Sequence, residues 1–461
     1  MVGALSLLLA TSVLGQRRPT GSAFAWLLVI ALVPYLGIPL YLVFGGRKFE
    51  RRARSKSSLA LRERPEDAGR PSDGEDALAL VRDAEPKSVR LLGDSRFSFR
   101  SVETIDWLDD GTRAYDSFLR EIEGAKESIR IVTFVVRDDT TGCPMMEALA
   151  RRAEAGVEVR LLIDDLLRFE APRRLLARIV RAGGRVERFM PLLHIPFRGR
   201  SNLRNHRKIA LFDGKKAIVG GMNLADEYMG PMPSETRWRD LSVVVSGQAV
   251  ATMDHVFRAD WEFACGESLA PLGSRAEPSL VRPGSIPLIV VPSGPDSPTD
   301  PIYDAVLTAI FRAERRFWVS TPYFVPDETL ARALVVAARR GVDVRIIVPQ
   351  VSNHRLADLA AAPYLRDLEE AGASVFRHPQ MLHAKAMLSD DSLGVVGSAN
   401  FDMRSLFLDY EIALFLPGAR EIARLARWFD ETLAPASRGA PKAGAVRAQV
   451  EDVARLLSPL I

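Results

Sequence analysis

The sequence predicts an α/β protein of two similar lobes, preceded by one or more N-terminal membrane helices. Three observations predict this arrangement. A 22-residue stretch without charge lies near the N-terminus, buried-strand patterns alternate with amphipathic helical patterns from about residue 91, and the second half repeats the plan of the first. At 461 residues the chain is long enough for an anchor and two full-size domains.

The first 54 residues are expected to anchor the chain in a membrane. The uncharged stretch Ala23–Phe44 would form a helix about 33 Å long, enough to cross the hydrocarbon core of a bilayer. Trp26 and Tyr41, near its two ends, have the positions of interfacial anchors. The earlier apolar run Val2–Leu14 is only marginally long enough to cross, so it is a second span, a re-entrant segment or the remnant of a mis-assigned start. We therefore predict one or two membrane segments at 1–54, with 23–44 the main span.

Charge around the main span predicts its orientation. The basic cluster Arg47–Lys56 directly follows the span, whereas the segment before it offers only Arg17 and Arg18. Under the positive-inside rule, everything after Phe44 then lies on the cytoplasmic side of the cell membrane, inner or plasma. Residues 55–90, rich in Arg, Glu, Asp, Ser and Pro, have little apolar periodicity and predict a charged, flexible linker.

Two lobes, 91–275 and 276–461, are predicted from the patterns after the linker. In each lobe, runs typical of buried strands alternate with amphipathic helices. The first lobe should contain a helix near 115–126, a strand at 128–136, a helix near 145–155 and a strand at 157–164. The second should contain a helix near 302–313, a strand at 316–321, a helix near 328–339 and a strand at 342–349. The segments AGVEVRLLID and RGVDVRIIVP have the same place in the two cycles, which indicates duplication.

The chemistry is duplicated as well, because the motif HxKxxxxD occurs once in each lobe. Five pairs of positions recur at a separation of 177 residues: His206 and His383, Lys208 and Lys385, Asp213 and Asp390, Gly220 and Gly397, Asn223 and Asn400. One such motif is expected by chance only about 0.01 times in a chain with 6 His, so two in register are not accidental. Only 9 of the 62 basic residues are Lys, and a Lys in each motif indicates that a compact ammonium is required there.

Paired HxKxxxxD motifs followed by GGxN or GSxN resemble the phospholipase D superfamily. Further segments are similar to its cardiolipin synthase branch: RNHRK (204–208), WRD (238–240), FRADW (257–261), TPYFVPDE (321–328), GSANFDMRS (397–405) and LLSPLI (456–461). The resemblance implies two phospholipase D-like α-β-α lobes packed about a pseudo-twofold axis. Two departures are modest: Gly221 takes the place of the Ser found at this point in the second motif, and Asn353 stands where the family often has Asp.

Such a site would use one imidazole as nucleophile and the other as acid and base. A neutral imidazole is a good nucleophile near pH 7, and a second imidazole can carry a proton at the same pH. If the lobes pack face to face, the two rings can flank one phosphorus and form a covalent phosphohistidine. We assign His206 as the nucleophile and His383 as the acid/base, and the near symmetry of the motifs leaves the reverse assignment open.

The other candidate residues would surround the phosphate. Lys208 and Lys385, two residues from each His, would clamp the non-bridging oxygens, where charge must be stabilised. Asn223, Asn400 and Ser398 would add hydrogen-bond donors to the same phosphate. These cations would replace a metal, and no His/Asp/Glu cluster with ligand spacing occurs elsewhere, so we predict that neither a metal nor another cofactor is needed.

Carboxylates are expected to orient the imidazoles and to brace the motif strands. Each imidazole needs its second ring nitrogen oriented, and the resemblance suggests Asp240 for the first motif's His and Glu411 for the second's. Asp213 and Asp390 complete the motifs as catalytic candidates, and we expect them to brace the motif strands rather than to touch the substrate.

One segment allows two interpretations. Met190–Arg204 mixes Leu, Ile and Phe with three Arg. It is either a loop packed on its own lobe, which we favour, or a segment that dips into the bilayer beside the site.

We predict a phosphatidyltransferase that moves a phosphatidyl group between two phosphatidylglycerol molecules, giving cardiolipin and glycerol. An anchor suits this function because it confines the enzyme and its lipid partners to one surface. The alternative is a membrane-bound hydrolase of the phospholipase D type, with water as the acceptor. No nucleic-acid partner is expected, because the chain lacks an aromatic-rich basic strand for stacking bases. A non-enzymatic scaffold is disfavoured because all six motif His, Lys and Asp are present.

The two cysteines, Cys143 and Cys265, form no CxxC pair and favour a reducing compartment. Nothing in the sequence indicates an oligomeric state.

Overall fold

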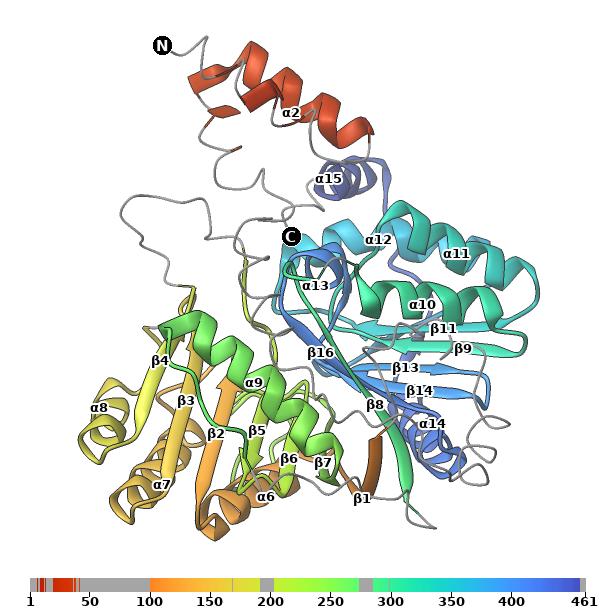
Figure 1. The fold of residues 1–461 in the computed structure, drawn as a ribbon. Coiled ribbons are helices and arrows are strands. Elements are labelled where there is room, and N and C mark those ends of the chain that lie inside the picture. The colour runs from red at the N-terminus through yellow and green to blue at the C-terminus, as the bar shows by residue number, and fades with distance from the viewer. Residues whose placement is uncertain are drawn as a thin grey trace, which may run out of the picture.

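The computed structural model describes residues 100–456 except 168, 191–202, 273–284 and 298, together with 20–35 and some positions between 6 and 41. Two lobes of similar plan lie side by side in this structure (Figure 1). The first lobe comprises β1 (Arg100–Leu108), α6 (Gly111–Gly124), β2 (Ser128–Thr133), α7 (Gly142–Glu154), β3 (Glu158–Asp164), α8 (Arg173–Arg181), β4 (Arg185–Phe189), β5 (Ile209–Phe212), β6 (Lys216–Gly220), β7 (Ser242–Gly247) and α9 (Ala249–Cys265).

The second lobe repeats this order with small additions. It comprises β8 (Ile286–Ser293), α10 (Pro301–Arg312), β9 (Arg316–Ser320), β10 (Phe324–Val325), α11 (Glu328–Arg339), β11 (Asp343–Pro349), α12 (Arg355–Glu370), β12 (Ser374–His378), β13 (Lys385–Ser389), β14 (Leu393–Gly397), β15 (Phe401–Asp402), α13 (Met403–Phe407), β16 (Glu411–Leu416), α14 (Ala419–Leu433), β17 (Ser437–Arg438) and α15 (Ala445–Leu456).

The sheet shows the duplication directly. From the junction outward, the strand order is β1-β7-β6-β5-β2-β3-β4 in the first lobe and β8-β16-β14-β13-β9-β11-β12-β17 in the second. β1 and β8 pair antiparallel through Arg100–Val102 and Ile286–Leu288, so one sheet of 15 strands runs through both lobes. β3 and β11, the strands of the shared sequence, even have the same pattern of buried positions. The expected α/β fold of two repeated lobes is confirmed.

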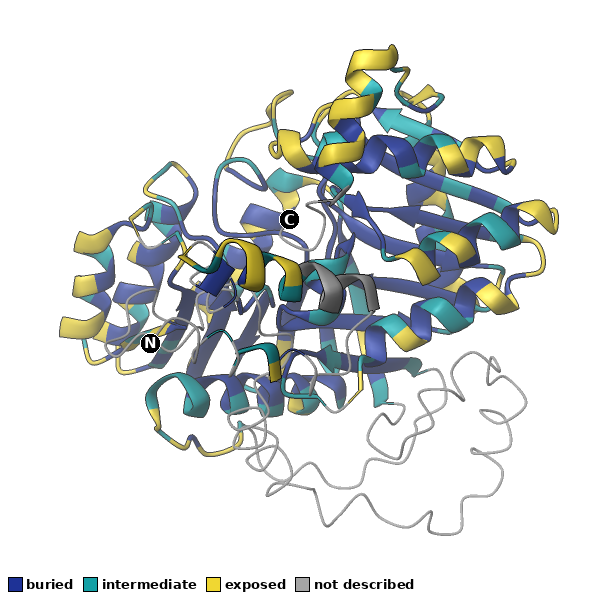
Figure 2. Ribbon diagram, turned by 90° about the horizontal axis from the view of Figure 1, so that it is seen from above, coloured by how far each residue is buried: buried dark blue, intermediate teal, exposed yellow. Residues whose placement is uncertain are grey.

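Helices cover both faces of the sheet, and the motif strands lie between them. In the first lobe α6, α7 and α8 pack on one face and α9 on the other, and in the second lobe α10, α11 and α12 lie opposite α14. The strands are almost entirely buried, whereas exposed positions gather on the outer helices and loops (Figure 2).

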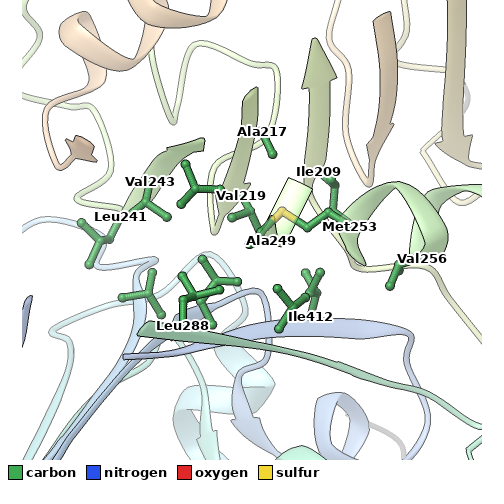
Figure 3. Close-up of a cluster of buried hydrophobic side chains, with 14 of the residues drawn as sticks. Ile209, Ala217, Val219, Leu241, Val243, Ala249, Met253, Val256, Leu288 and Ile412 are labelled. Carbon is green, nitrogen blue, oxygen red and sulfur yellow. The ribbon is translucent and has the colours of Figure 1, made fainter. Parts of the chain in front are cut away.

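One hydrophobic cluster joins the two lobes. Leu241 and Val243 of the first lobe face Leu288 and Ile412 of the second across a layer of apolar side chains (Figure 3). Trp261 of α9 and Trp428 of α14 are fully buried in the same cluster. A buried Trp is worth several kcal/mol of stability, about 3–5 when truncated to Ala, so this core holds the lobes in a fixed relation.

The N-terminal segment differs from the expectation. Within the described residues, no helix combines the length and the apolar character that crossing a bilayer requires, and α2 covers Thr20–Leu32. The rings of Trp26 and Tyr41 are in edge-to-face contact, with centroids 5.3 Å apart, whereas a straight helix would separate these positions by about 22 Å. The chain therefore folds back between them, at Pro34, which cannot donate the next helical hydrogen bond. The expectation that these two rings anchor opposite ends of one span is wrong. The linker, the Arg47–Lys56 cluster and most of the segments 190–204 and 456–461 lie outside the described residues.

Candidate active site

The two motifs occupy equivalent strands at the centre of the lobes. His206 and Lys208 directly precede β5, which lies between β2 and β6. His383 and Lys385 stand at the start of β13, which lies between β9 and β14. Both histidines therefore come at the strand end where the two lobes meet.

Backbone bridges fix each histidine to the other lobe. The amide of His206 donates to the carbonyl of Tyr410 (2.9 Å), and the amide of His383 donates to the carbonyl of Arg239 (2.8 Å). Single parallel bridges, Asn205 with Tyr410 and Arg239 with Leu382, complete these contacts. Each motif is thus held by the segment that runs into β16 or β7 of the opposite lobe.

The imidazoles take their carboxylate partners from the opposite lobe as well. Nδ1 of His206 lies 2.9 Å from Oε1 of Glu411, and Nδ1 of His383 lies 2.7 Å from Oδ2 of Asp240. The pairing expected from the sequence, Asp240 with His206 and Glu411 with His383, is therefore wrong. The physical reason is the pair of backbone bridges: Glu411 follows Tyr410 and Asp240 follows Arg239, so each carboxylate arrives beside the other lobe's motif.

The geometry sets the protonation of both rings. Each carboxylate accepts a hydrogen bond from Nδ1–H, which fixes the tautomer whose lone pair is on Nε2. Burial, with repulsion from the neighbouring ammonium groups, lowers the pKa of His206 to about 4 and that of His383 to about 3. Each ring responds to the ammonium of the other lobe, because Lys385 lowers the pKa of His206 and Lys208 lowers that of His383. The two motifs therefore form one electrostatic site with two neutral imidazoles at pH 7.

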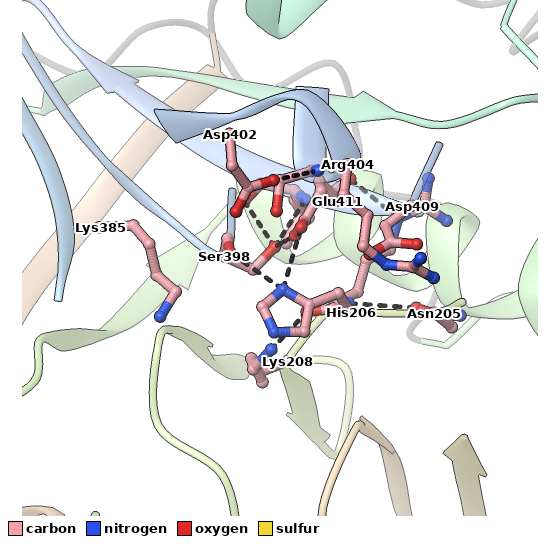
Figure 4. A network of polar contacts seen from close by, with 12 residues as sticks. Asn205, His206, Lys208, Lys385, Ser398, Asp402, Arg404, Asp409 and Glu411 are labelled. Atoms are coloured by element: carbon pink, nitrogen blue, oxygen red, sulfur yellow. Dashed lines mark hydrogen bonds and ion pairs between the residues drawn. The ribbon is translucent and has the colours of Figure 1, made fainter. Parts of the chain in front are cut away.

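The two lysines are buried cations. The Nζ of Lys208 donates to the carbonyl of His206 (2.6 Å), and the Nζ of Lys385 lies 3.0 Å from Nε2 of His383. Burial and mutual repulsion lower the pKa of Lys208 to about 7, and burial lowers that of Lys385 to about 8. In Figure 4 the amine end of Lys208 lies beside the His206 ring, and Lys385, which comes from the other lobe, lies to one side of it.

The motif aspartates stand away from this centre. Asp213 accepts hydrogen bonds from the amides of Lys126, Glu127 and Ser128, and Asp390 does the same for residues 314–316. Both have left-handed backbone (φ 51° and 49°), which Asp tolerates better than most residues. They lie five residues beyond the motif lysines, roughly 17 Å along the strand. In this structure both aspartates tie the motif hairpin to the start of the neighbouring strand.

Comparison with known proteins identifies the family. The family described as "Cardiolipin synthase, PLD-like domain" matches residues 118–261 and 306–433, which include both motifs. The chain is 32% identical over 470 residues to "Major cardiolipin synthase ClsA" of Bacillus subtilis (strain 168), covering 99% of this chain and 97% of that protein. It is likewise 32% identical over 489 residues to "Cardiolipin synthase" of Oceanobacillus iheyensis, covering 99% and 97%. The chain belongs to the cardiolipin synthase family.

Two further matches concern the N-terminal segment and the fold. A family described as a phospholipase D–nuclease N-terminal segment matches residues 4–46. The crystal structure of phosphatidylserine synthase from Haemophilus influenzae Rd KW20 superposes with a TM-score of 0.62 at 15% identity, covering 82% of this chain and all of that one. The family and the fold expected from the motifs are confirmed.

The second lobe supports its carboxylate with a serine. Ser398 was expected to bind phosphate, but its hydroxyl donates to Oε2 of Glu411 and accepts from the amide of Ile412 (3.0 Å). It is fully buried, so its hydrogen bonds position Glu411 rather than reach a substrate. The equivalent residue of the first lobe is Gly221, where a Cβ would lie 2.1 Å from Oδ1 of Asp240. Gly in place of the second motif's Ser therefore leaves the space that the carboxylate of Asp240 occupies.

The amide side chains are placed differently from each other. Oδ1 of Asn223 accepts from the amide of Val135 (3.2 Å), which leaves its NH₂ group for other partners. Asn400 is buried and its Oδ1 has no hydrogen-bond partner among the described residues. A buried polar atom without a partner is costly, so a ligand that donates a hydrogen bond here would relieve that cost.

Three aromatic residues contact the imidazoles without having been singled out from the sequence. Phe134 meets the ring of His206 edge-on at 5.2 Å, and Tyr228 and Trp238 contact His383 at 5.0 and 5.5 Å. They restrict rotation of both rings and keep the site dry. Trp238 stands in the WRD segment and could have been found there, but nothing in the sequence marks Phe134 or Tyr228.

Among the described residues, no three His, Cys, Asp or Glu side chains gather in a way that could hold a metal ion.

Proposed function

We propose that this protein is a cardiolipin synthase that transfers a phosphatidyl group from one phosphatidylglycerol to another through a phosphohistidine on His206. The observation that carries the proposal is the exchange of partners between the lobes. Two neutral imidazoles share one site, and each is oriented by a carboxylate from the opposite half. This arrangement supports the proposal, because it would supply a nucleophile and a proton carrier to a single phosphate.

The charges of the site favour binding of a phosphodiester. Lys208 and Lys385 contribute two positive charges, and Asp240 and Glu411 contribute two negative ones, so the four cancel when both lysines are protonated. A bound phosphodiester adds one negative charge. That charge raises the pKa of nearby bases, and one proton on an imidazole restores neutrality. We infer that binding of the lipid raises the pKa of His383, so that this ring takes up the proton that it later donates as an acid.

In the first half-reaction, Nε2 of His206 attacks phosphorus. The P–O bond to the departing glycerol breaks, and the alkoxide oxygen takes the proton from Nε2 of His383. In the second, a hydroxyl of the acceptor phosphatidylglycerol gives its proton to Nε2 of His383 and attacks phosphorus, and the P–N bond breaks. The products are cardiolipin and glycerol, and both rings return to their starting state. Glu411 would stabilise the positive charge that forms on His206, and Asp240 that on His383.

Phospholipid substrates place the reaction at a membrane. We propose that the protein is membrane-associated through its N-terminal segment, with the lobes on the cytoplasmic side, as the distribution of basic residues around 23–44 favours. Water in place of the acceptor lipid would give phosphatidic acid, the product of the hydrolase alternative.

The test incubates the full-length protein with vesicles of phosphatidylglycerol and identifies products by mass spectrometry. We expect cardiolipin and glycerol in equal amounts. His206→Ala and His383→Ala should each lower synthesis at least about 1000-fold, whereas His255→Ala, a histidine of α9, should not. Phosphatidic acid as the sole lipid product would contradict transfer, and near-normal turnover by either motif variant would contradict the two-histidine mechanism.

A further inference from the structure

The last helix in the described part of the chain, α15, exposes its three valines to the outside. Val446, Val450 and Val453 of α15 are 78%, 49% and 59% exposed. They are spaced i, i+4 and i+7, which places them on one face of the helix. The opposite face is buried and contains Glu451, which is fully buried, and Ala454. This helix therefore buries a carboxylate and exposes three valines, the reverse of a helix on a water-facing surface.

Ion pairs fix this orientation. Glu451 accepts from Arg366 of α12 (2.7 Å) and from Arg447 of its own helix (2.8 Å). Ala454 packs against Ala357 and Ala360 of α12. Rotating α15 would break the ion pairs of the fully buried Glu451 with the half-buried Arg366 and with Arg447, so the valines stay exposed.

Other exposed apolar side chains lie in the loops that surround the active site. Leu166 and Phe169 follow β3, whose last residue, Asp164, accepts the amide of Asn205 next to the motif histidine (2.9 Å). On the opposite side of the site, the loop after β11 exposes Val351.

That loop connects the site to α15. It contains Asn353, which accepts a hydrogen bond from Tyr323 (2.6 Å), and Tyr323 packs with Ala357 and Ala454 in the cluster under α15. Leu356, at the start of α12, is exposed next to this cluster. By contrast, exposed Val180 and Phe311 lie at the ends of α8 and α10, which lead into the opposite, amino-terminal ends of β4 and β9.

We infer that the valine face of α15, together with the apolar loops after β3 and β11, rests in the surface of the lipid bilayer and delivers lipid headgroups to the site. The inference rests on the proposed function, because it assigns the surface through which that function reaches its substrate. A helix with an apolar stripe bounded by basic residues lies in the plane of a membrane interface. Arg447 on α15 and Lys442, three residues before the helix, carry positive charge near the stripe and match an anionic lipid surface. Arg455 instead lies over the ring of Tyr364 and pairs with Asp452. Figure 1 shows the N-terminal helix α2, which exposes Leu28 and Leu32, on the same side of the molecule as α15.

The activity test uses the full-length triple variant Val446→Gln, Val450→Gln, Val453→Gln. Phosphatidylglycerol is offered either in unilamellar vesicles or dispersed in detergent micelles. We expect synthesis on vesicles to fall at least about fivefold and synthesis in micelles to stay within about twofold, because micelles deliver lipid without docking on a bilayer. The matched control, Val180→Gln with Phe311→Gln, should change neither rate. An equal loss in vesicles and micelles, or no loss in either, would overturn the inference.

A binding readout separates this inference from the proposed function. In a chain with Cys143→Ser and Cys265→Ser, an environment-sensitive fluorophore is placed at Val450→Cys or, as control, at Val180→Cys. Vesicles of phosphatidylglycerol with a quencher attached near the lipid headgroup should quench the label at 450 at least about threefold more than that at 180. Equal quenching would overturn the inference even if cardiolipin is made. Intermolecular disulfides in the unlabelled Val450→Cys chain, with no quenching of the labelled chain, would also overturn it, by showing that a second copy covers this face. Strong quenching at 450 in a protein that makes no cardiolipin would uphold the docking surface and reject the proposed function.

Discussion

The two lobes share a fold but hold their carboxylates differently. In the first lobe the acid is the shorter Asp240, and Gly221 beside it leaves the space that its carboxylate occupies. In the second lobe the acid is the longer Glu411, and Ser398 donates a hydrogen bond to it. Each acid serves the histidine of the opposite lobe. The comparison shows that the two lobes share the backbone of the site but differ in the side chains around it, as we expect if one ring is the nucleophile and the other the proton carrier.

The largest expected effect comes from removing either carboxylate's charge. Glu411→Gln and Asp240→Asn should each lower kcat at least about 100-fold, because a neutral amide cannot stabilise an imidazolium or hold the same tautomer. Rapid-quench kinetics on phosphatidylglycerol vesicles should then distinguish the lobes. Glu411→Gln should slow formation of the phosphohistidine itself. A normal burst of glycerol with Glu411→Gln would show that His206 does not depend on the opposite lobe.

Exchanging the small residues should give unequal effects. Gly221→Ser places a Cβ 2.1 Å from Oδ1 of Asp240, so the acid must move and kcat should fall at least about tenfold. Ser398→Gly removes one hydrogen bond to Glu411 and should cost about 1–2 kcal/mol of stability and only a few-fold in kcat. Steady-state rates and thermal unfolding of both variants check this order. Equal and small losses in both variants would mean that each lobe tolerates either Gly or Ser beside its carboxylate.

The smallest expected effect concerns pH. The pKa values of about 7 for Lys208 and about 8 for Lys385 mean that the ligand-free protein loses its phosphate-binding cations as pH rises, starting in the first lobe. The histidines, with pKa values of about 4 and 3, stay neutral over this range. We therefore expect kcat/KM to fall above about pH 7, by up to about tenfold per unit, while kcat changes less because bound phosphate holds the lysines protonated. Lys208→Arg, which retains its charge, should remove the first step, and a flat kcat/KM profile to pH 9 would contradict the assignment.

Much of this account could be predicted from the sequence because the chain repeats itself. The constant separation of the paired motif residues predicted two lobes of one plan, and the shared segments AGVEVRLLID and RGVDVRIIVP marked equivalent strands. The presence of Asp240 and Glu411 near the histidines could also be expected, but their pairing could not. That pairing depends on the bridges Asn205–Tyr410 and Arg239–Leu382, which are tertiary contacts without a periodic signal. Ser398 was assigned to phosphate because a hydroxyl near a motif can serve either a ligand or a neighbouring acid, and only the packing decides between them.

The N-terminal segment shows a second limit. Length and hydropathy predicted a straight span over 23–44, but the contact between Trp26 and Tyr41 requires the chain to turn back within it. Pro34 was visible in the sequence. Whether Pro34 bends the helix depends on whether neighbouring groups donate hydrogen bonds to the carbonyls that it leaves without a partner. A sequence pattern does not predict this.

The most direct test is a crystal structure of the protein with vanadate, a mimic of phosphorus during transfer. The account predicts one vanadium joined to Nε2 of His206, with Nε2 of His383 within hydrogen-bond reach of a vanadate oxygen, about 2.6–3.2 Å, and both lysines on the remaining oxygens. Vanadate held by one lobe alone, with the second ring beyond reach of any of its oxygens, would contradict the claim that two half-sites act on one phosphate.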